Sequence, residues 1–396
     1  MQAEKRIITL RKVWLKVHRY LGLTLGAMFA IIGLTGSLIV FWQPLDALLN
    51  PDLFRTTTGC ALSLYRPLDD IVAAAQTHAP DKGKLRLLTF PNPERPVFTA
   101  AYEVPAPGTD WDDRYIVFVE PCNGLVTGSR FYDSQLRPLD GPLMGVAIRI
   151  HTSLLLNFPG FWLGNNLISF GSVFIACSML IGVYLWWPRN RRWLTALTIK
   201  RRSSRERFNY DLHKVFGVFA GFLLLVSLFT GIHMYSPWTE WIDQGINNLS
   251  PVTRLTTGAT SSQLTPGKKV ISAEQALKIA SANIPQSYPI SLAFPGDEQG
   301  VYSITLKSDS VWDGEVIIDQ YSGKILQLYG PNNATAGDHF LGWLFPLHTG
   351  QAFGLTGRIL ILFLGLMPIL LYVTGFIRWR QKRKSRRLHI SKQTTY

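Results

Sequence analysis

Histidines recur at matching places in the two halves of this chain. His18 and His213 each precede an apolar run and begin the same pattern, HxxxGxxxG. His151 and His348 each lie in a short HTS or HTG segment ahead of a later apolar run. Imidazole is a common axial ligand of haem iron, and ionisable side chains at membrane depth usually mark a functional site. The pattern therefore predicts that these four residues are the iron ligands of two haem sites.

Glycines accompany the first histidine of each half. A spacing of four residues holds in both places, at His18, Gly22 and Gly26 and again at His213, Gly217 and Gly221. Residues four apart share one helical face, so these glycines are predicted to leave a flat slot in which a porphyrin lies against the backbone. A histidine at the membrane surface beside a GxxxG helix contact is the simpler interpretation, and it does not account for the repetition.

The third apolar run, residues 212–235, contains a further histidine, His233. It lies 20 residues after His213, which is about 30 Å along a helix at about 1.5 Å per residue. One macrocycle cannot reach both rings, so two cofactor sites are expected, stacked across the bilayer. A turn of about 100° per residue points the two rings to nearly opposite sides, so His151 and His348 are preferred over His233 at the outer site.

Four apolar stretches are long enough to cross a hydrocarbon core, which takes about 20 residues. They are residues 20–42, 167–187, 212–235 and 357–379. Basic clusters precede the first, join the second to the third and follow the fourth, so the positive-inside rule places both termini in the cytoplasm. The net charge of +14 then reflects topology, with membrane lipid as the partner and no nucleic-acid binding expected.

The two halves of the chain resemble each other in sequence. "HRYLGLTLGAMFAIIGLTG" at 18–36 aligns without gaps on "HKVFGVFAGFLLLVSLFTG" at 213–231, and "IRIHTSLLLNF" at 148–158 resembles "FPLHTGQAFGL" at 345–355. The predicted fold class is therefore an integral membrane α-helical protein with four transmembrane helices in two parallel repeats, related by a pseudo-two-fold axis along the membrane normal. A residue near that axis is expected to meet its own counterpart.

The long segments between spans one and two and between spans three and four are predicted to lie outside as two small α+β domains. In the second, Ser272 begins a helical pattern that reaches residue 284, with Glu274 shortly after, and residues 321–324 are predicted to form a hairpin turn. Residues 251–270 are predicted to be a linker. Cys60 and Cys122 both fall in the first segment and can pair in an oxidising compartment, but the sequence does not decide whether they do.

The segments around the two outer histidines are predicted to be re-entrant or interfacial pieces at the outer leaflet, because the apolar runs after them can nearly cross the membrane by themselves. Arg149 and Arg358 lie in this region. Their guanidinium groups are expected either to bind haem propionates or to reach lipid headgroups.

Several short motifs resemble one known family. They are the paired HR and HTG segments, the hairpin "DQYSGKIL" and the Thr-Gly pairs Thr35-Gly36, Thr230-Gly231 and Thr374-Gly375, and they resemble the PepSY-associated transmembrane helix family. Its members are often described as iron-regulated membrane proteins, and some resemble ferric-siderophore reductases of the bacterial inner membrane. The resemblance implies PepSY-like periplasmic domains, two haem b cofactors and an oxidoreductase that reduces a periplasmic ferric siderophore from Fe(III) to Fe(II) for iron release. The first half departs from the second, with HTS for HTG and EPCNG for DQYSG.

The electron donor is expected to be a quinol or an unidentified cytoplasmic protein, because the chain has no GxGxxG or Walker-type motif and its cytoplasmic loop is too short for a flavin domain. Two other functions compete with the reductase. A non-redox, membrane-anchored PepSY binding module needs no haem and leaves the repeated histidines unexplained. A component that transports siderophore or haem has few helices for alternating access, and the predicted spans contain no carboxylate for proton coupling.

The predicted organisation has eight segments. They are the cytoplasmic N-terminus with the first transmembrane helix (1–42), the first periplasmic domain (43–142), an outer interfacial segment with the second transmembrane helix (143–187), a basic cytoplasmic loop (188–211), the third transmembrane helix (212–236), the second periplasmic domain (237–338), an outer interfacial segment with the fourth transmembrane helix (339–380) and a basic cytoplasmic tail (381–396). The expected location is the bacterial inner membrane.

Overall fold

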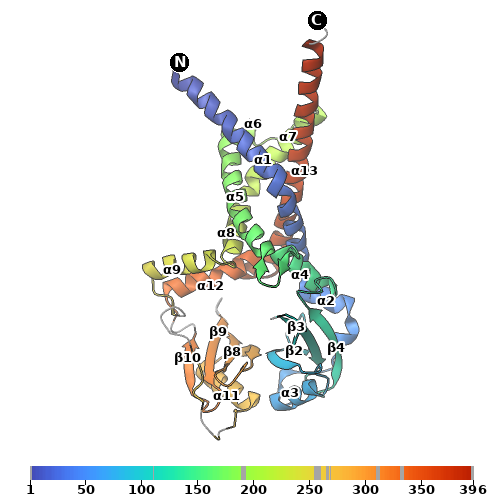
Figure 1. Cartoon of the computed structure of the whole chain (residues 1–396), viewed down its shortest axis with the longest axis vertical. Coiled ribbons are helices and arrows are strands. Elements are labelled where there is room, and N and C mark those ends of the chain that lie inside the picture. The colour runs from blue at the N-terminus through green and yellow to red at the C-terminus, as the bar shows by residue number, and fades with distance from the viewer. Residues whose placement is uncertain are drawn as a thin grey trace.

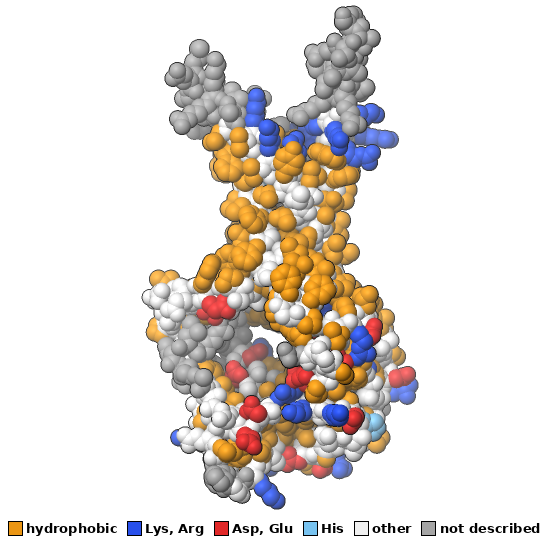
Figure 2. Space-filling view, viewed as in Figure 1, with side chains coloured by type: hydrophobic (Ala, Val, Ile, Leu, Met, Phe, Trp, Pro, Cys, Tyr) orange, Lys and Arg blue, Asp and Glu red, His pale blue; other side chains and the backbone are white. Residues whose placement is uncertain are grey.

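The structure, a computed structural model, describes residues 2–109, 111–188, 193–253, 260–264, 267, 269–308, 313–330 and 334–393. Long helices form a bundle at the end that carries both termini, and a β-sheet domain lies at the other end (Figure 1). Hydrophobic side chains cover the bundle, Lys and Arg gather near the termini, and charges of both signs cover the sheet domain (Figure 2). This distribution is typical of a membrane protein with a basic end and one water-exposed domain.

Three of the described helices are long and apolar enough to cross a membrane. They are α1 (Gln2–Ile39), α5 (Leu163–Trp186) and α13 (Gly354–Gln393). The third predicted span is instead a pair of helices, α7 (Arg205–Phe219) and α8 (Gly221–Ile232), with a bend of 55° at Ala220. If this bent pair crosses the membrane as one span, the structure has four spans. Gly217 and Gly221 flank the bend, and glycines are a common cause of sharp helix kinks. The expectation of a straight helix from His213 to His233 was therefore wrong.

The helices α1 and α13 approach each other at backbone distance. A Cβ placed on Gly33 would lie 2.4 Å from the carbonyl oxygen of Gly365, so only glycine fits there. One turn further along α1, the hydroxyl of Ser37 donates to the carbonyl of Leu362 at 2.7 Å. Small residues that admit such close contact are typical of helix packing in membranes.

The domain outside the bundle is built on one antiparallel sheet of eight strands. The strands are β1 (Lys84–Thr89), β2 (Phe98–Pro105), β3 (Asp112–Val119), β4 (Val126–Asp133), β7 (Tyr288–Ala293), β8 (Val301–Lys307), β9 (Asp313–Asp319) and β10 (Ile325–Tyr329), in the order β10-β9-β8-β7-β1-β2-β3-β4. Strands β8 and β9 alternate buried and partly exposed residues, as expected when one face of a sheet packs on a core.

The two predicted α+β units share this sheet, which the sequence did not indicate. Strand β1 of the first pairs with β7 of the second, and Leu88 lies opposite Leu292 at the centre. Both leucines are fully buried. From this central pair outwards, β2, β3 and β4 follow β1 on one side, and β8, β9 and β10 follow β7 on the other. The two halves of the sheet therefore have the same strand order.

Two short helices, α3 (Leu68–Gln76) and α11 (Ala273–Asn283), pack against the sheet and complete the core. Their first turns cap each other. The backbone N–H of Leu68 donates to Glu274 Oε2 at 2.8 Å, and the N–H of Glu274 donates to Asp69 Oδ1 at 3.0 Å. The predicted helix start at Ser272 is confirmed, although its capping box uses Gln275 and leaves Glu274 for the neighbouring helix.

A buried carboxylate organises the outer hairpin turn of each half. Asp319 accepts backbone N–H groups from Tyr321, Ser322 and Gln263, and the predicted turn is present, with Gly323 in the left-handed conformation. Burial raises the pKa of Asp319, but these hydrogen bonds outweigh it and hold the pKa at about 2. Glu120 occupies the same place in the first half and accepts from residues 57, 122 and 123.

A disulfide links Cys60 and Cys122, with Cα atoms 5.9 Å apart. It settles the pairing that the sequence left open. These sulfurs and a Glu120 oxygen form the one group of three close metal-binding side chains in the described part of the chain, and because the thiols are joined we do not assign a metal there.

Further short elements lie within the sheet domain, between the sheet and the bundle, and, for α6, in the loop between α5 and α7. They are α2 (Trp42–Leu49), η1 (Pro51–Phe54), η2 (Leu62–Leu64), α4 (Leu143–Ser153), β5 (Asn157–Phe158), β6 (Phe161–Trp162), α6 (Trp193–Ala196), α9 (Trp238–Leu249), α12 (Ala336–Thr349) and η3 (Gln351–Phe353). The helices α4 and α12 occupy the two segments predicted to be interfacial, between the sheet and the bundle (Figure 1). The predicted linker at 251–270 falls partly outside the described residues.

Candidate functional site: two histidine pairs

The first pair joins α1 to α7. The imidazole rings of His18 and His213 have centres 6.3 Å apart. The Nδ1 of His18 donates to the carbonyl of Ser178 at 2.8 Å, and the Nδ1 of His213 donates to the carbonyl of Leu371 at 3.1 Å. The hydroxyl of Thr374 lies 2.9 Å from the Nδ1 of His213. Helices α5 and α13 thus orient the two rings from outside the pair.

The second pair joins α4 to α12. His151 and His348 have ring centres 6.2 Å apart. Their Nδ1 atoms donate to the carbonyls of Ile32 on α1, at 2.9 Å, and Ser227 on α8, at 3.0 Å. The hydroxyl of Thr230 lies 3.2 Å from the Nδ1 of His348. The residues that the sequence matched across the two halves therefore lie next to each other in both pairs.

The hydrogen bonds fix which ring nitrogen carries the proton. A carbonyl oxygen can only accept, so Nδ1 is the protonated nitrogen in all four rings. In a neutral imidazole the lone pair then resides on Nε2, which is the atom left to bind a metal. Histidine ligands of metals are usually oriented by such a hydrogen bond from the other nitrogen.

Each imidazole ring lies against a glycine of a neighbouring helix. A Cβ placed on these glycines would come 2.8 to 3.3 Å from a ring Cε1 atom. The contacts are His18 on Gly182, His213 on Gly375, His151 on Gly36 and His348 on Gly231. The sequence pattern included three of these glycines in its Thr-Gly pairs, but it did not assign them a role. They admit the rings, while Thr230 and Thr374 supply hydroxyls to two of the Nδ1 atoms.

The donor set suits a haem iron with two axial histidines. Rings that bind one metal from opposite sides have centres about 6 Å apart, given about 2 Å from each nitrogen to the metal and about 1 Å from nitrogen to ring centre. Both observed separations, 6.3 and 6.2 Å, agree with this value. The four residues therefore fit two such groups, one for each pair.

The separation of the pairs follows from α1, which contacts both. His18 lies on this helix, and so does Ile32, whose carbonyl holds His151. They are 14 residues apart, which is about 21 Å along a helix. His213 and Ser227 are 14 residues apart as well. Two sites at different depths are consistent with these positions.

The four glycines predicted to form slots divide into two kinds. A Cβ on Gly22 or Gly221 would meet no atom within 4 Å, so the backbone there faces open space, as a slot for a flat ligand requires. Gly26 lies against the Tyr372 ring and Gly217 against Leu371, at 3.2 and 3.6 Å from such a Cβ. These two glycines serve helix packing.

The remaining predicted histidine, His233, is not part of either ring pair. It ends α8, and its Nε2 lies 2.8 Å from Oδ1 of Asp243 on α9. The nitrogen that would bind a metal thus faces a carboxylate.

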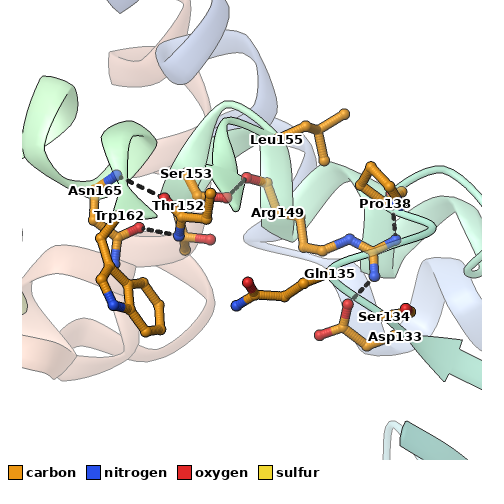
Figure 3. A pocket seen from close by; sticks show the side chains of 11 residues that line it. Asp133, Ser134, Gln135, Pro138, Arg149, Thr152, Ser153, Leu155, Trp162 and Asn165 are labelled. Atoms are coloured by element: carbon orange, nitrogen blue, oxygen red, sulfur yellow. Dashed lines mark hydrogen bonds and ion pairs between the residues drawn. The ribbon is translucent and has the colours of Figure 1, made fainter. Parts of the chain in front are cut away.

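The two predicted arginines have protein partners. Arg149 pairs with Asp133 and donates to the carbonyl of Pro138 at 2.6 Å, at the edge of a polar cavity of about 220 Å³ between α4 and the end of β4 (Figure 3). Arg358 pairs with Glu94 of the loop between β1 and β2, and it donates to the carbonyl of Val40 at 2.8 Å. Each charge is thus balanced by a protein carboxylate, although Nε of Arg149 is buried without a hydrogen-bond partner. These ion pairs lie at the contact between the sheet domain and the bundle.

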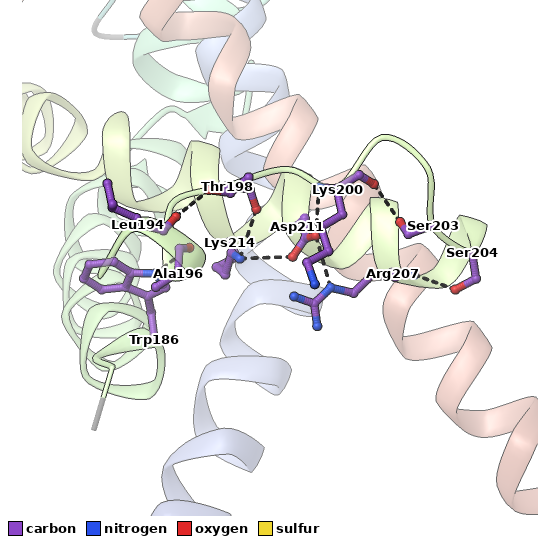
Figure 4. A network of polar contacts seen from close by, with 10 residues as sticks. All are labelled: Trp186, Leu194, Ala196, Thr198, Lys200, Ser203, Ser204, Arg207, Asp211 and Lys214. Atoms are coloured by element: carbon purple, nitrogen blue, oxygen red, sulfur yellow. Dashed lines mark hydrogen bonds and ion pairs between the residues drawn. The ribbon is translucent and has the colours of Figure 1, made fainter. Parts of the chain in front are cut away.

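A buried carboxylate that the sequence missed lies beside the first pair. Asp211 on α7 is fully buried two residues before His213, and it binds Lys214 at 3.0 Å and Arg207 at 3.1 Å. The N–H of Lys200 donates to it at 3.3 Å, which ties the preceding loop to the helix (Figure 4). It lies one residue before the predicted third span, so it falls outside the stretches that the sequence shows to be free of carboxylates.

The helix that carries His348 is fixed at its start by Asp338. This carboxylate forms a capping box with Thr335 and accepts the N–H and hydroxyl of Thr253. Burial raises the pKa of Asp338, but these hydrogen bonds outweigh it and lower the pKa below its usual value. The start of α12 is therefore well anchored.

Comparison with known proteins gives one result for most of the chain. Residues 15–382 match the model of the family described as the PepSY-associated TM region. No curated protein matches the chain.

Proposed function

Because the chain belongs to the family of the PepSY-associated TM region, we propose that it is a di-haem b electron-transfer protein of the bacterial inner membrane. In this proposal it reduces Fe(III) in a ferric siderophore on the periplasmic side, with electrons from a cytoplasmic protein or from quinol. The observation that carries the proposal is the pair of matching histidine contacts, with ring centres 6.3 and 6.2 Å apart and the same tautomer in all four rings. Haem, when bound, supplies reversible one-electron transfer.

We further propose four transmembrane segments in two parallel repeats, with both termini in the cytoplasm. The bent pair α7 and α8 then counts as the third segment. Support comes from the equal spacing in the two halves, where 14 residues separate His18 from Ile32 and His213 from Ser227. The sheet also supports the two repeats, because Leu88 pairs with Leu292 at the centre of eight symmetrically ordered strands.

The residues of each site have separate tasks in this proposal. His18 and His213 would hold the inner haem, and His151 and His348 the outer one. The carbonyls of the neighbouring helices keep Nδ1 protonated and Nε2 free to bind. Apolar helices around the rings exclude water, which favours the less charged state of a bound cofactor.

Iron release follows from the chemistry of the substrate. Each Fe(III) takes up one electron to become Fe(II), and a donor on the other side loses one. Chelators with hard, negatively charged oxygen ligands hold Fe(III) by charge attraction, which falls on reduction. The chelator itself is left intact.

The first experiment is a dithionite-reduced minus oxidised spectrum of the full chain in detergent, with haem counted by pyridine haemochrome. Two b-type haems per chain are expected. His18→Ala and His151→Ala should each remove one haem and keep the other, because each variant disrupts one pair. The His233→Ala variant is the matched control and should keep both.

A colourless protein from haem-replete cells would refute the redox proposal and favour a membrane-anchored binding module. Loss of both haems in each single variant, or of neither, would contradict two separate pairs. If haem is present, the dithionite-reduced protein should convert a ferric trihydroxamate chelate to Fe(II), detected by a colourimetric Fe(II) trap. Haem reduction without Fe(II) release would keep the electron-transfer assignment and reject the substrate.

A further inference from the structure

A small cavity lies where α2, the helix that follows α1, packs against the sheet domain. Its volume is about 40 Å³, and it is lined by residues of α2, the β1–β2 loop and strands β2 to β4, among them Trp42, Asp46, Arg95, Arg130 and Tyr132. A water molecule needs about 10–15 Å³ on the same measure. The cavity therefore has room for one small polyatomic group.

The charges around this cavity do not balance. Asp46 is 3% exposed, and its carboxylate is already used by Arg130, whose two terminal nitrogens bind it side by side, and by the amide of Asn50 at 2.9 Å. Arg95 is 7% exposed and has no ion-pair partner in the part of the chain that the structure describes. The two guanidinium groups at this cavity are therefore accompanied by a single carboxylate, which pairs with Arg130 alone.

Arg95 is also left with an unsatisfied donor. One terminal nitrogen donates to the carbonyl of Phe90 at 3.2 Å, whereas Nε is buried and has no partner. Burial lowers the pKa of Arg95 to about 10, partly opposed by Tyr132 and Asp46, so the side chain stays charged at neutral pH. A buried charge without a counter-ion is strongly unfavourable.

The backbone holds this arginine in place. Residues 92 to 95 form a tight turn in which the N–H groups of Asn92 and Arg95 donate to each other's carbonyls, and the Asn92 side chain accepts the N–H groups of Glu94 and Arg95. The next residue back, Glu94, pairs with Arg358 of α13. The cavity therefore lies beside the β1–β2 loop, through which the sheet domain contacts α13.

We propose that Arg95 and Arg130 form a binding site for one small oxyanion of the phosphate type. An oxyanion supplies the missing negative charge and accepts the free Nε–H of Arg95. Guanidinium groups prefer paired oxygen acceptors of this kind. The phosphate can be inorganic phosphate or the headgroup of a phospholipid, because α2 follows α1 directly at the end of the apolar segment.

The test uses the full chain in detergent after lipid depletion, titrated with inorganic phosphate by calorimetry. One site per chain is expected. Arg95→Met should weaken binding about tenfold or more, since it removes a charged donor. Arg86→Met is the matched control, because Arg86 forms a partly exposed pair with Glu103 in the same domain. This variant should bind phosphate as the unaltered chain does.

A second arm separates the two sources of phosphate. The same three proteins are reconstituted in nanodiscs of phosphatidylglycerol and phosphatidylethanolamine, and retained phospholipid is counted by native mass spectrometry. Retention of one lipid that is lost only in Arg95→Met assigns the site to a headgroup, whereas phosphate binding without such retention assigns it to the free ion. The proposal is overturned if the unaltered chain shows neither phosphate binding nor lipid retention, or if Arg95→Met leaves both unchanged. If Arg95→Met does not fold, Arg95→Lys replaces it, since lysine keeps the charge but lacks the paired donors.

Discussion

Replacing Gly36 by alanine is expected to remove the outer haem and leave the inner one. The new Cβ would lie 2.8 Å from Cε1 of His151, whereas carbon atoms in contact prefer about 3.5–4.0 Å. The α1 backbone that carries the new Cβ is fixed by the hydrogen bonds of its helix. The His151 ring must therefore move away by about 1 Å. Metal sites tolerate about 0.2 Å in ligand distance, so the displacement is several times larger than a bound iron accepts.

The assay is haem per chain and the reduced minus oxidised spectrum of the Gly36→Ala protein. The count should fall from two to one, and the remaining spectrum should match that of His151→Ala. Gly231→Ala, where the Cβ would lie 2.9 Å from Cε1 of His348, should behave in the same way. Gly245→Ala on α9 is the control, because its Cβ would meet no atom within 4 Å.

The overall fold should survive, because overpacking of this kind costs about 1–3 kcal/mol, and alanine in a helix recovers up to about 1 kcal/mol relative to glycine. Two haems with unchanged spectra in Gly36→Ala would refute the argument that this glycine sets the position of the outer ring. Loss of both haems would show instead that the two pairs are not independent.

Three further expectations concern stability. Gly33→Leu should lower the thermal unfolding midpoint in detergent, because its Cβ would lie 2.4 Å from the backbone of α13; an unchanged midpoint would contradict the close crossing. Since the pKa of Asp319 is held at about 2 against a usual value of 3.8, its contribution of about 2 kcal/mol is present above pH 4 and lost as the pH falls toward 2. The Asp319→Asn protein should therefore be less stable at pH 7, and its free energy of unfolding should change less between pH 4 and pH 2. Identical pH profiles of the two proteins would show that the Asp319 carboxylate does not contribute this stability. Replacing both Cys60 and Cys122 by serine opens a loop of 62 residues and should cost about 4 kcal/mol, measured by denaturant unfolding with and without reductant; no difference would mean that the bond does not constrain the unfolded chain.

The sequence predicted well those features that repeat locally. The helix at 273–283, the turn at 321–324 and the contact of each histidine with its counterpart all follow from patterns within one half and their match in the other. The pairing of β1 with β7 was not predictable, since it joins segments about 200 residues apart and depends on register alone.

The ion pairs of the two arginines could not be predicted for the same reason. Glu94 is far in sequence from Arg358, and Asp133 lies on a strand whereas Arg149 lies on a helix. Nothing in their spacing indicates these ion pairs. The glycines beneath the rings did leave a signal, because the Thr-Gly pairs recur near the ends of the apolar runs. That repetition marks places where a ring from another helix is received.

The contacts of the first histidine pair also set an order of assembly during synthesis. His18 is made almost at once, but its partner His213 arrives when half the chain has been translated, and the carbonyl that orients His213 belongs to Leu371 on the final long helix. The outer pair likewise waits for His348. A nascent chain that lacks α13 therefore contains all residues of the outer pair but not the carbonyl that orients His213. Whatever the inner pair binds can be held in its final geometry only after the last helix has joined the bundle.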